Sequence, residues 1–525
     1  MLKQQVASSA SAIYAKLSTK PFILYAPVII PKMSTTESPM RPQKPRGIDH
    51  TDSGSEDEIV EQGKVNMPTN GRYFPLGYKD AAWQWWSSIS PPLAENAVLS
   101  HMPYLKRSTD SFTTLPSEVA AEAVADPYGN RVWKRTLVKL SGQDRALNEI
   151  SIERVGEETE ETLVMLHGYG AGLGFFYKNL EPISRTKGLQ LYALDMLGMG
   201  NSSRPAFKVH AKEKEDRVIE AESFFIDALE EWRKARKIER FTLLGHSLGG
   251  YLAVSYALKY PGHLNKLILA SPVGIPEDPF AVNSALPEPE ESTMTNEFTQ
   301  SQEVTTESNT TGRSARAANS ARRPMPGWLV WLWDQNVSPF SIVRLAGPLG
   351  PRFVSGWTSR RFSHLPPAEA QALHDYSFSI FKQKGSGEYA LTYLLAPGAY
   401  ARRPVIHRIQ DVGRQVISKG EDGKPLKKEH GFPVVFMYGE NDWMDADGGH
   451  DSAKKLNQAS KQALTEASDE DKRLEKGSAK VIVVPKSGHH LYLDNPESFN
   501  KYMAKELKHT LTDLRQQRAE SAKGN

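Results

Sequence analysis

The sequence contains no cysteine among its 525 residues. The chain therefore cannot form a disulfide, a thiolate metal site or a cysteine nucleophile. It also lacks a long apolar run, because the longest candidate, PFILYAPVII at 21–30, is interrupted by proline, so we expect no membrane-spanning helix. A large excess of one charge is also absent: the net charge is +3 and no long basic run occurs, which disfavours a nucleic-acid partner. Any nucleophile must be another residue type.

The first 36 residues contain several lysines and serines but no acidic residue. That composition is typical of a mitochondrial transit peptide, and it also fits a disordered tail. Residues 37–70 are rich in proline, serine, threonine and charge, which indicates a linker. We therefore expect residues 1–70 to form a targeting or disordered N-terminal extension.

Strand-like and helix-like segments alternate after this extension, with TLVMLHG, LQLYALDM, RFTLLGHS and LNKLILASPV as the clearest strand patterns. Such alternation predicts an α/β fold with a mostly parallel sheet and helices on both faces. A polar stretch with few large apolar residues interrupts the pattern, and the strands resume at FPVVFMYGEND. The predicted parts are a Trp-rich N-terminal segment at 71–130, a first core part at 131–276, a disordered insertion at 277–325, a lid and connecting loop at 326–430, and a second core part at 431–525.

The stretch RFTLLGHSLGGYLAVSYALKY contains the pattern G-x-S-x-G, with Ser247 at its centre. The bare pattern is weak, because glycine is common enough to produce it by chance. Its context is stronger: an apolar strand pattern ends at the motif and a helical pattern begins directly after it. A nucleophile elbow requires this strand, sharp turn and helix, and glycines permit the close backbone approach. The sequence therefore predicts Ser247 as a nucleophile.

A serine hydroxyl needs a base to take its proton and an acid to hold that base in one tautomer. Two later strand patterns end in suitable residues. VVFMYGENDWMD offers Asp442, three residues after the glycine, and Asp445 as the alternative acid. VIVVPKSGHH offers two histidines: His489 directly follows a glycine, and the side chain of His490 should diverge from it. We predict a triad of Ser247, Asp442 and His489.

Acyl transfer also develops an oxyanion, which needs preorganised backbone donors. The glycine-rich turn LHGYGAG at 166–172 follows an earlier strand pattern. We therefore predict that the backbone amides of Tyr169 and Leu248 form the oxyanion hole, with Gly170 as the competitor of Tyr169.

Most of the tryptophans lie in two places, the N-terminal segment and the lid. Tryptophan is favoured where lipid meets water, and arginines nearby could attract anionic head groups. The alternative is that the rings pack the lid onto the core. We expect contact with a membrane or lipid surface. The tryptophans are Trp83, Trp85, Trp86, Trp328, Trp331, Trp333 and Trp357, and the arginines are Arg322, Arg323, Arg344, Arg352, Arg360 and Arg361.

Four segments carry a resemblance to a known family: FFIDALEEWRKARKIERFTLLGHSLGGYLAVSYALKYPGHLNKLILASPVGIP, SPFSIVRLAGPLGPRFV, YGENDWMD and SGHHLYLDNPESFN. From about residue 71 to the end, the polar insertion excepted, the chain resembles one subfamily of α/β-hydrolase-domain proteins. Its members include the fungal cardiolipin-specific deacylase, lysophosphatidic-acid acyltransferases and the animal coactivator of adipose triglyceride lipase. The resemblance implies an α/β-hydrolase fold with an inserted helical lid. It also implies a serine-dependent acyl enzyme acting on membrane phospholipid, with Ser247 and His489 as catalytic residues.

The resemblance further implies an H-x-x-x-x-D pair, His489 and Asp494, which is often linked to acyl transfer to lysophospholipids. The residues themselves also allow Asp494 a plainer place beside the cap of the last helix. The choice of Asp442 over Asp445 is not settled by the resemblance. The animal coactivator lacks the nucleophile, whereas this chain keeps Ser247, which argues against a purely noncatalytic role.

We expect a phospholipid deacylase whose substrate is cardiolipin, with the protein peripheral on the mitochondrial inner membrane. The alternative location is the cytoplasm or a lipid droplet. The alternative activities are acyl-CoA-dependent acylation of lysophosphatidic acid and the recruitment of a lipase by a noncatalytic lipid-surface protein. We expect no cofactor and no metal.

Overall fold

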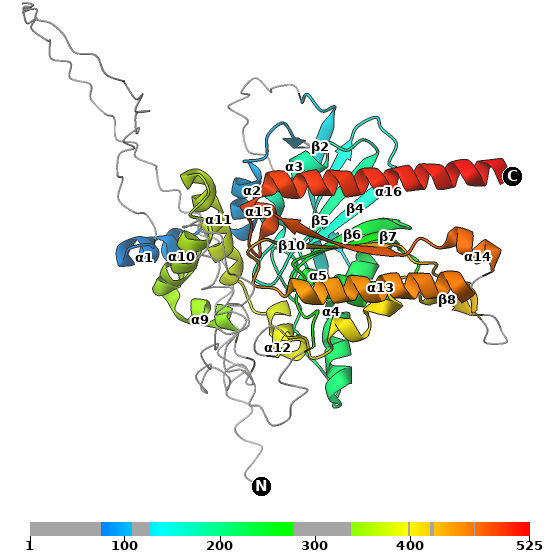
Figure 1. Cartoon of the computed structure of the whole chain (residues 1–525). Coiled ribbons are helices and arrows are strands. Elements are labelled where there is room, and N and C mark those ends of the chain that lie inside the picture. The colour runs from blue at the N-terminus through cyan, green and yellow to red at the C-terminus, as the bar shows by residue number, and fades with distance from the viewer. Residues whose placement is uncertain are drawn as a thin grey trace, which may run out of the picture. The chain divides into compact units, whose positions relative to one another are not determined.

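A computed structural model describes residues 75–107, 126–277, 336, 338–396, 400–419, 425–466 and 468–524. Within these residues a nine-stranded sheet is flanked by helices (Figure 1). Its strands are β1 (Lys106–Arg107), β2 (Arg131–Lys139), β3 (Ala146–Arg154), β4 (Glu161–Leu166), β5 (Leu189–Leu194), β6 (Phe241–His246), β7 (Leu264–Ala270), β10 (Pro433–Gly439) and β11 (Ser478–Val484).

The strand order is β1-β2-β3-β5-β4-β6-β7-β10-β11. Neighbouring strands from β5 to β11 are parallel, whereas β3 is antiparallel to both β2 and β5. Because parallel strands end at the same edge, the loops after β4, β6, β10 and β11 come together there. The prediction of a mostly parallel sheet with helices on both faces is confirmed.

Helices cover the two faces of the sheet, with α3 and α16 on one face and α4, α5 and α13 on the other (Figure 1). All six residues of β4 and all six of β6 are buried. Strands covered on both faces must be apolar throughout, which explains their continuous hydrophobic runs. These helices are α3 (Tyr177–Ile183), α4 (Lys214–Ala235), α5 (Leu248–Lys259), α13 (Ala446–Glu466) and α16 (Pro496–Gly524).

A group of short helices is inserted between β7 and β10, and we call it the lid. It lies in the part of the chain predicted as lid, although residues 326–335 fall outside the described residues. A hairpin of β8 (Val416–Lys419) and β9 (Pro425–Lys428) follows it, which the sequence pattern did not indicate. The lid comprises α9 (Pro339–Leu345), η3 (Gly347–Leu349), α10 (Gly350–Arg361), α11 (Pro367–Phe381), η4 (Gly387–Ala390) and α12 (Leu391–Leu394).

The Trp-rich segment forms α1 (Tyr78–Ser87) and α2 (Pro91–Leu99), and α1 packs beside α10 while α2 packs beside α11. The predicted extension at 1–70 lies outside the described residues, and so do residues 278–325 of the insertion predicted at 277–325. Among the helices that the structure describes, none has the length and hydropathy needed to cross a membrane.

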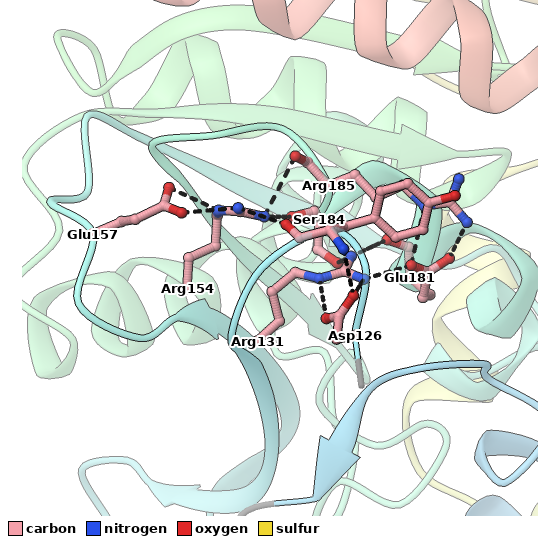
Figure 2. A network of polar contacts seen from close by, with 8 residues as sticks. Asp126, Arg131, Arg154, Glu157, Glu181, Ser184 and Arg185 are labelled. Atoms are coloured by element: carbon pink, nitrogen blue, oxygen red, sulfur yellow. Dashed lines mark hydrogen bonds and ion pairs between the residues drawn. The ribbon is translucent and has the colours of Figure 1, made fainter. Parts of the chain in front are cut away.

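Figure 2 shows a network of arginine, carboxylate and serine side chains. It lies at the edge of the sheet opposite the loops that follow β4, β6, β10 and β11. Arg131 pairs with Asp126 at 2.8 Å and with Glu181 at 2.6 Å, and its side chain is fully buried. Arg154, at the end of β3, binds Glu157 at 2.8 Å. Because β3 runs antiparallel to β5, its end lies near the start of β5. Paired charges at this edge join β2, β3 and α3. They lie away from the loops that carry the candidate site.

Candidate functional site

Ser247 lies between β6 and α5 with a backbone φ of 52° and ψ of −117°. A non-glycine residue in such a conformation costs about 1–3 kcal/mol and persists only where its surroundings impose it. Here the amide of Ser247 donates to the carbonyl of Ala270 at 2.9 Å, and its carbonyl accepts from the amide of Gly250 at 2.9 Å. The turn is therefore held at both backbone groups, with the strained geometry predicted for a nucleophile elbow.

The two glycines of the motif are required by packing. A methyl group at Gly245 would overlap the carbonyl of Gly249. A methyl group at Gly249 would lie 2.6 Å from the carbonyl oxygen of His167, in the glycine-rich turn after β4. The elbow and that turn are thus in direct backbone contact, which no larger residue would allow.

Asp442 and His489 meet at the ends of β10 and β11. The Nδ1 atom of His489 lies 3.2 Å from Oδ1 of Asp442, and the two side chains are 1% and 2% exposed. Asp442 also accepts hydrogen bonds from the hydroxyl of Ser271 and from the amide of Met444, the latter at 3.1 Å. This carboxylate is therefore held in place by several donors, and it is placed to keep the proton of His489 on Nδ1.

Asp445 has a different partner. Its Oδ1 accepts from the amide of Asp447 at 2.9 Å. Because α13 begins at Ala446, this is the hydrogen bond of an N-cap residue. The structure thus brings Asp442, rather than Asp445, to the histidine, although the sequence alone left both open.

The backbone of His489 is held by the residue before the serine. His246, the residue before the serine, donates from Nε2 to the backbone carbonyl of His489 at 3.0 Å. Burial and the neighbouring His489 hold the pKa of His246 well below its usual value, so His246 is a neutral donor. Within the described residues, the buried Nε2 atom of His489 has no hydrogen-bond partner. An imidazole nitrogen of this kind, opposite a carboxylate-bound Nδ1, is free to accept a proton.

The glycine-rich turn after β4 lies against the elbow. A methyl group at Gly168 would lie 3.0 Å from Cβ of Ser247 and 2.9 Å from Nδ1 of His246. Tyr169 follows directly, and its ring stacks on Phe340 of the lid with centroids 5.2 Å apart. Leu248 is the first residue of α5, so its backbone N–H has no carbonyl within the helix to which it could donate. Both predicted oxyanion residues thus belong to segments in contact with the serine.

His490 diverges from His489, as predicted, with their ring planes at 90°. His490 is nevertheless buried, and its Nδ1 accepts a hydrogen bond from Nε of Arg361 at 3.1 Å. Burial and the positive charge of Arg361 hold the pKa of His490 well below its usual value, so its ring is neutral. The carboxylate of Asp494 binds Nη1 of Arg361 at 2.8 Å and accepts from the amide of Gly488 at 3.0 Å. Asp494 therefore contacts the lid and the backbone beside His489, while Asn495 accepts from the amide of Ser498, as a cap does.

The lid packs against the glycine-rich turn beside the site, where Gly170, Phe340 and Phe381 line a cavity of about 20 Å³, room for roughly one water molecule. Neither Ser247 nor His489 lines this cavity. As whole residues, Ser247 is 8% exposed and His489 is 3% exposed. Because both are buried, we expect a substrate of lipid size to reach the serine only after the surrounding segments rearrange.

The prediction that lid arginines and tryptophans face lipid needs correction at three positions. Trp357 is buried and packs against Phe362 and Phe381. Arg344 pairs with Glu388 inside the lid at 2.7 Å, and Arg361 is bound as described above. Apolar contact and buried carboxylates outcompete solvent at these sites. Trp83 and Trp86 are exposed, whereas Trp328, Trp331, Trp333, Arg322 and Arg323 lie outside the described residues.

Comparison with known proteins defines the class. A family model described as alpha/beta hydrolase fold matches residues 161–496, and the chain belongs to that family. A probable 1-acylglycerol-3-phosphate O-acyltransferase of Oryza sativa subsp. japonica is 33% identical, over 72% of this chain and 73% of that protein. The 1-acylglycerol-3-phosphate O-acyltransferase ABHD5 of Mus musculus is 29% identical, over 72% of this chain and 85% of that protein. A (lyso)-N-acylphosphatidylethanolamine lipase of Bos taurus is 28% identical, over 74% and 86%. The predicted subfamily is confirmed, and with it a hydrolase or acyltransferase class of enzyme.

Proposed function

We propose that this protein is a serine-dependent phospholipid deacylase. The observation that carries the proposal is the contact between His489 and Asp442 at the same sheet edge as the strained Ser247. A base with a carboxylate on Nδ1 and an unpartnered Nε2, near an elbow serine, is suited to remove the serine proton.

In the proposed reaction, Oγ of Ser247 attacks the ester carbonyl carbon while Nε2 of His489 takes the hydroxyl proton. The amides of Tyr169 and Leu248 stabilise the oxyanion. The tetrahedral intermediate then collapses, the bond to the glycerol oxygen breaks, and His489 returns its proton to that oxygen as the lysolipid leaves. Water attacks the acyl enzyme by the same sequence, which releases the fatty acid and restores Ser247.

Cardiolipin is the proposed substrate, since the subfamily that the sequence resembles includes a cardiolipin-specific deacylase and residues 1–36 have a transit-like composition. The relatives named above support a substrate of the phospholipid class more broadly. Purified protein incubated with cardiolipin vesicles should release fatty acid and monolysocardiolipin, detected by mass spectrometry. The absence of any lysolipid from cardiolipin, with release from another phospholipid, would move the proposal to that head group.

Replacement of the nucleophile tests the chemistry. Ser247→Ala should abolish release. Ser377→Ala is a matched control, because Ser377 is a buried serine of the lid whose hydroxyl donates to the carbonyl of Leu373 in its own helix. Full activity of Ser247→Ala would refute serine catalysis. Loss of activity in both variants would indicate damage to the fold rather than to the reaction.

Transfer of the acyl group to lysophosphatidic acid is the second candidate, because two relatives are named for that reaction. Ser247 would take the acyl group from acyl-CoA, with the thioester bond breaking and CoA leaving as a thiol that takes its proton from His489. The hydroxyl of lysophosphatidic acid, rather than water, would then attack the acyl enzyme and give its proton to His489. Labelled lysophosphatidic acid with acyl-CoA should then yield phosphatidic acid, and Ser247→Ala should block that product as well. Unchanged transfer in Ser247→Ala would indicate a direct transfer route.

We also propose that the protein docks on a lipid surface through α1 and the neighbouring part of the lid, which pack side by side. Trp86 is 79% exposed in α1 and Leu345 is 87% exposed in the lid. Trp86→Ser and Leu345→Ser should weaken co-sedimentation with vesicles. Leu426→Ser is the control, since this equally apolar, 74% exposed residue lies in the β8–β9 hairpin. Cleavage of the N-terminal segment upon import into isolated mitochondria tests the proposed location at the inner membrane.

A further inference from the structure

One arginine of the lid reaches the loop that carries the candidate base. Arg361 is the last residue of α10, and its side chain is 5% exposed. It binds His490 through Nε at 3.1 Å and Asp494 through Nη1 at 2.8 Å, across more than a hundred residues of sequence. These two contacts join the lid to the segment between β11 and α16.

The second oxygen of Asp494 continues the connection. It accepts from the amide of Gly488 at 3.0 Å, and Gly488 directly precedes His489. The guanidinium, the carboxylate and this amide thus form one chain of charge-assisted hydrogen bonds from the lid to the backbone of the base. Such bonds are shorter and stronger than those between neutral groups.

The connection is incomplete at one atom. Nη2 of Arg361 is buried and has no hydrogen-bond partner within the described residues. A buried donor without a partner favours the conformation in which water can reach it, and here that is a displaced lid. Because His490 is a neutral acceptor, it does not compensate the positive charge of Arg361. The contact with Arg361 therefore restrains the lid but still permits its displacement.

We propose that Arg361 is a positioning residue for His489 and acts through Asp494 as a latch between the lid and the base. The latch rests on the proposed function for its catalytic consequence, because only then is His489 a base. It assigns the aspartate of the H-x-x-x-x-D pattern to positioning, with no proton transfer of its own. When the lid moves to admit substrate, the loop of His489 loses a fixed support, so lid position and base geometry are coupled.

Hydrogen exchange measures this coupling without any need for activity. In the full-length protein, Arg361→Gln should raise the exchange rate of peptide 485–495 about tenfold, within the range of coupling energies between contacting charged groups. Arg344→Gln is the matched control, since it breaks an ion pair inside the lid with Glu388 and should leave that peptide unchanged. Unchanged exchange in Arg361→Gln, or an equal rise in the control, would overturn the latch.

Kinetics on a soluble short-chain ester separate the two hydrogen bonds of Asp494. Asp494→Asn keeps an oxygen for the amide of Gly488 and loses the charge that binds Arg361, whereas Asp494→Ala loses both. We expect Asp494→Asn and Arg361→Gln each to lower kcat about tenfold with KM little changed, and the double variant to lose no more than Arg361→Gln alone, because both variants break the ion pair between Arg361 and Asp494. Asp494→Ala should lose more. Arg361→Lys should recover part of the loss through its charge alone.

Additive losses in the double variant would refute the latch. The fate of the proposed function is read separately from Ser247→Ala: if that variant stays active, serine catalysis fails, while the exchange measurement still decides whether Arg361 holds the loop.

Discussion

Asp442→Asn removes one negative charge from the site with little change of shape. The hydroxyl of Ser271 now donates to Oδ2 of Asp442, and by rotating it can accept from the new amide instead. The amide of Gly439 also donates to Oδ2, at 3.4 Å, and the variant loses this long contact. Oδ1 then stays directed at Nδ1 of His489, with the amide of Met444 as its other donor. The variant therefore tests the charge of Asp442 rather than the orientation of the ring.

The size of the effect follows from the distance. At 3.2 Å between Nδ1 and Oδ1, Coulomb's law with an effective dielectric constant of about 20 gives about 5 kcal/mol of attraction to a protonated histidine. His489 carries that charge only after it has taken the serine proton, so the attraction is lost from the transition state. One decade of rate corresponds to about 1.36 kcal/mol, and kcat should fall by about 10³ to 10⁴.

The assay is steady-state hydrolysis of a soluble ester by Asp442→Asn, with Asp445→Asn as the matched control. Asparagine caps a helix as well as aspartate does, so the control removes a nearby charge and keeps the N-cap of α13. Its kcat should stay within about twofold of the original. A control that loses as much activity as Asp442→Asn, or an Asp442→Asn protein with more than a tenth of the original kcat, would refute the assignment of the acid.

Two further outcomes follow from packing and burial. Gly168→Ala should lower kcat about tenfold or more, since its methyl group would press on Ser247 and His246. Gly356→Ala is the control: its methyl group would meet nothing within 4 Å, and alanine favours the helix α10, so this variant should raise Tm. Burial and Asp195 raise the pKa of Glu95 to about 7. Because the folded protein binds this proton more tightly than the unfolded chain, the stability contributed by the protonated form is full below about pH 4.5 and is lost as the pH rises through about 7. Glu95→Gln should reduce the drop in urea midpoint between about pH 5 and pH 8, and an unchanged drop would show that Glu95 does not titrate as stated.

Local pattern was enough to predict most of the sheet and the order of the site loops. β6 and α5 around Ser247 are a strand and a helix whose residues alone carry the signal. The loop after β11 that carries His489 could be predicted in the same way, because the apolar run that ends at Val484 indicates a strand and the proline and glycine that follow indicate a turn. The choice between Asp442 and Asp445 could not be settled from the sequence. Both lie in one turn, and the exact start of α13 decides which of them becomes the N-cap of that helix.

Other parts of the site depend on contacts that no local pattern records. Ser271 donates to Asp442 across 171 positions of sequence, and its only local signal is its place directly after β7. Arg361 was among the arginines expected to attract anionic head groups, yet it is buried and paired with Asp494. His246 could have been noticed as part of the motif, although its bond to the carbonyl of His489 requires the assembled sheet.

The burial of Ser247, which is 8% exposed, also bears on how the protein would behave toward an irreversible inhibitor. A fluorophosphonate that reacts with serine should modify Ser247 only in molecules whose site is open, so its apparent rate constant would be the intrinsic one multiplied by the open fraction. Labelling in plain buffer should be slow and should accelerate when vesicles are added. The rate of covalent labelling would then measure the opening of the site without any substrate turnover.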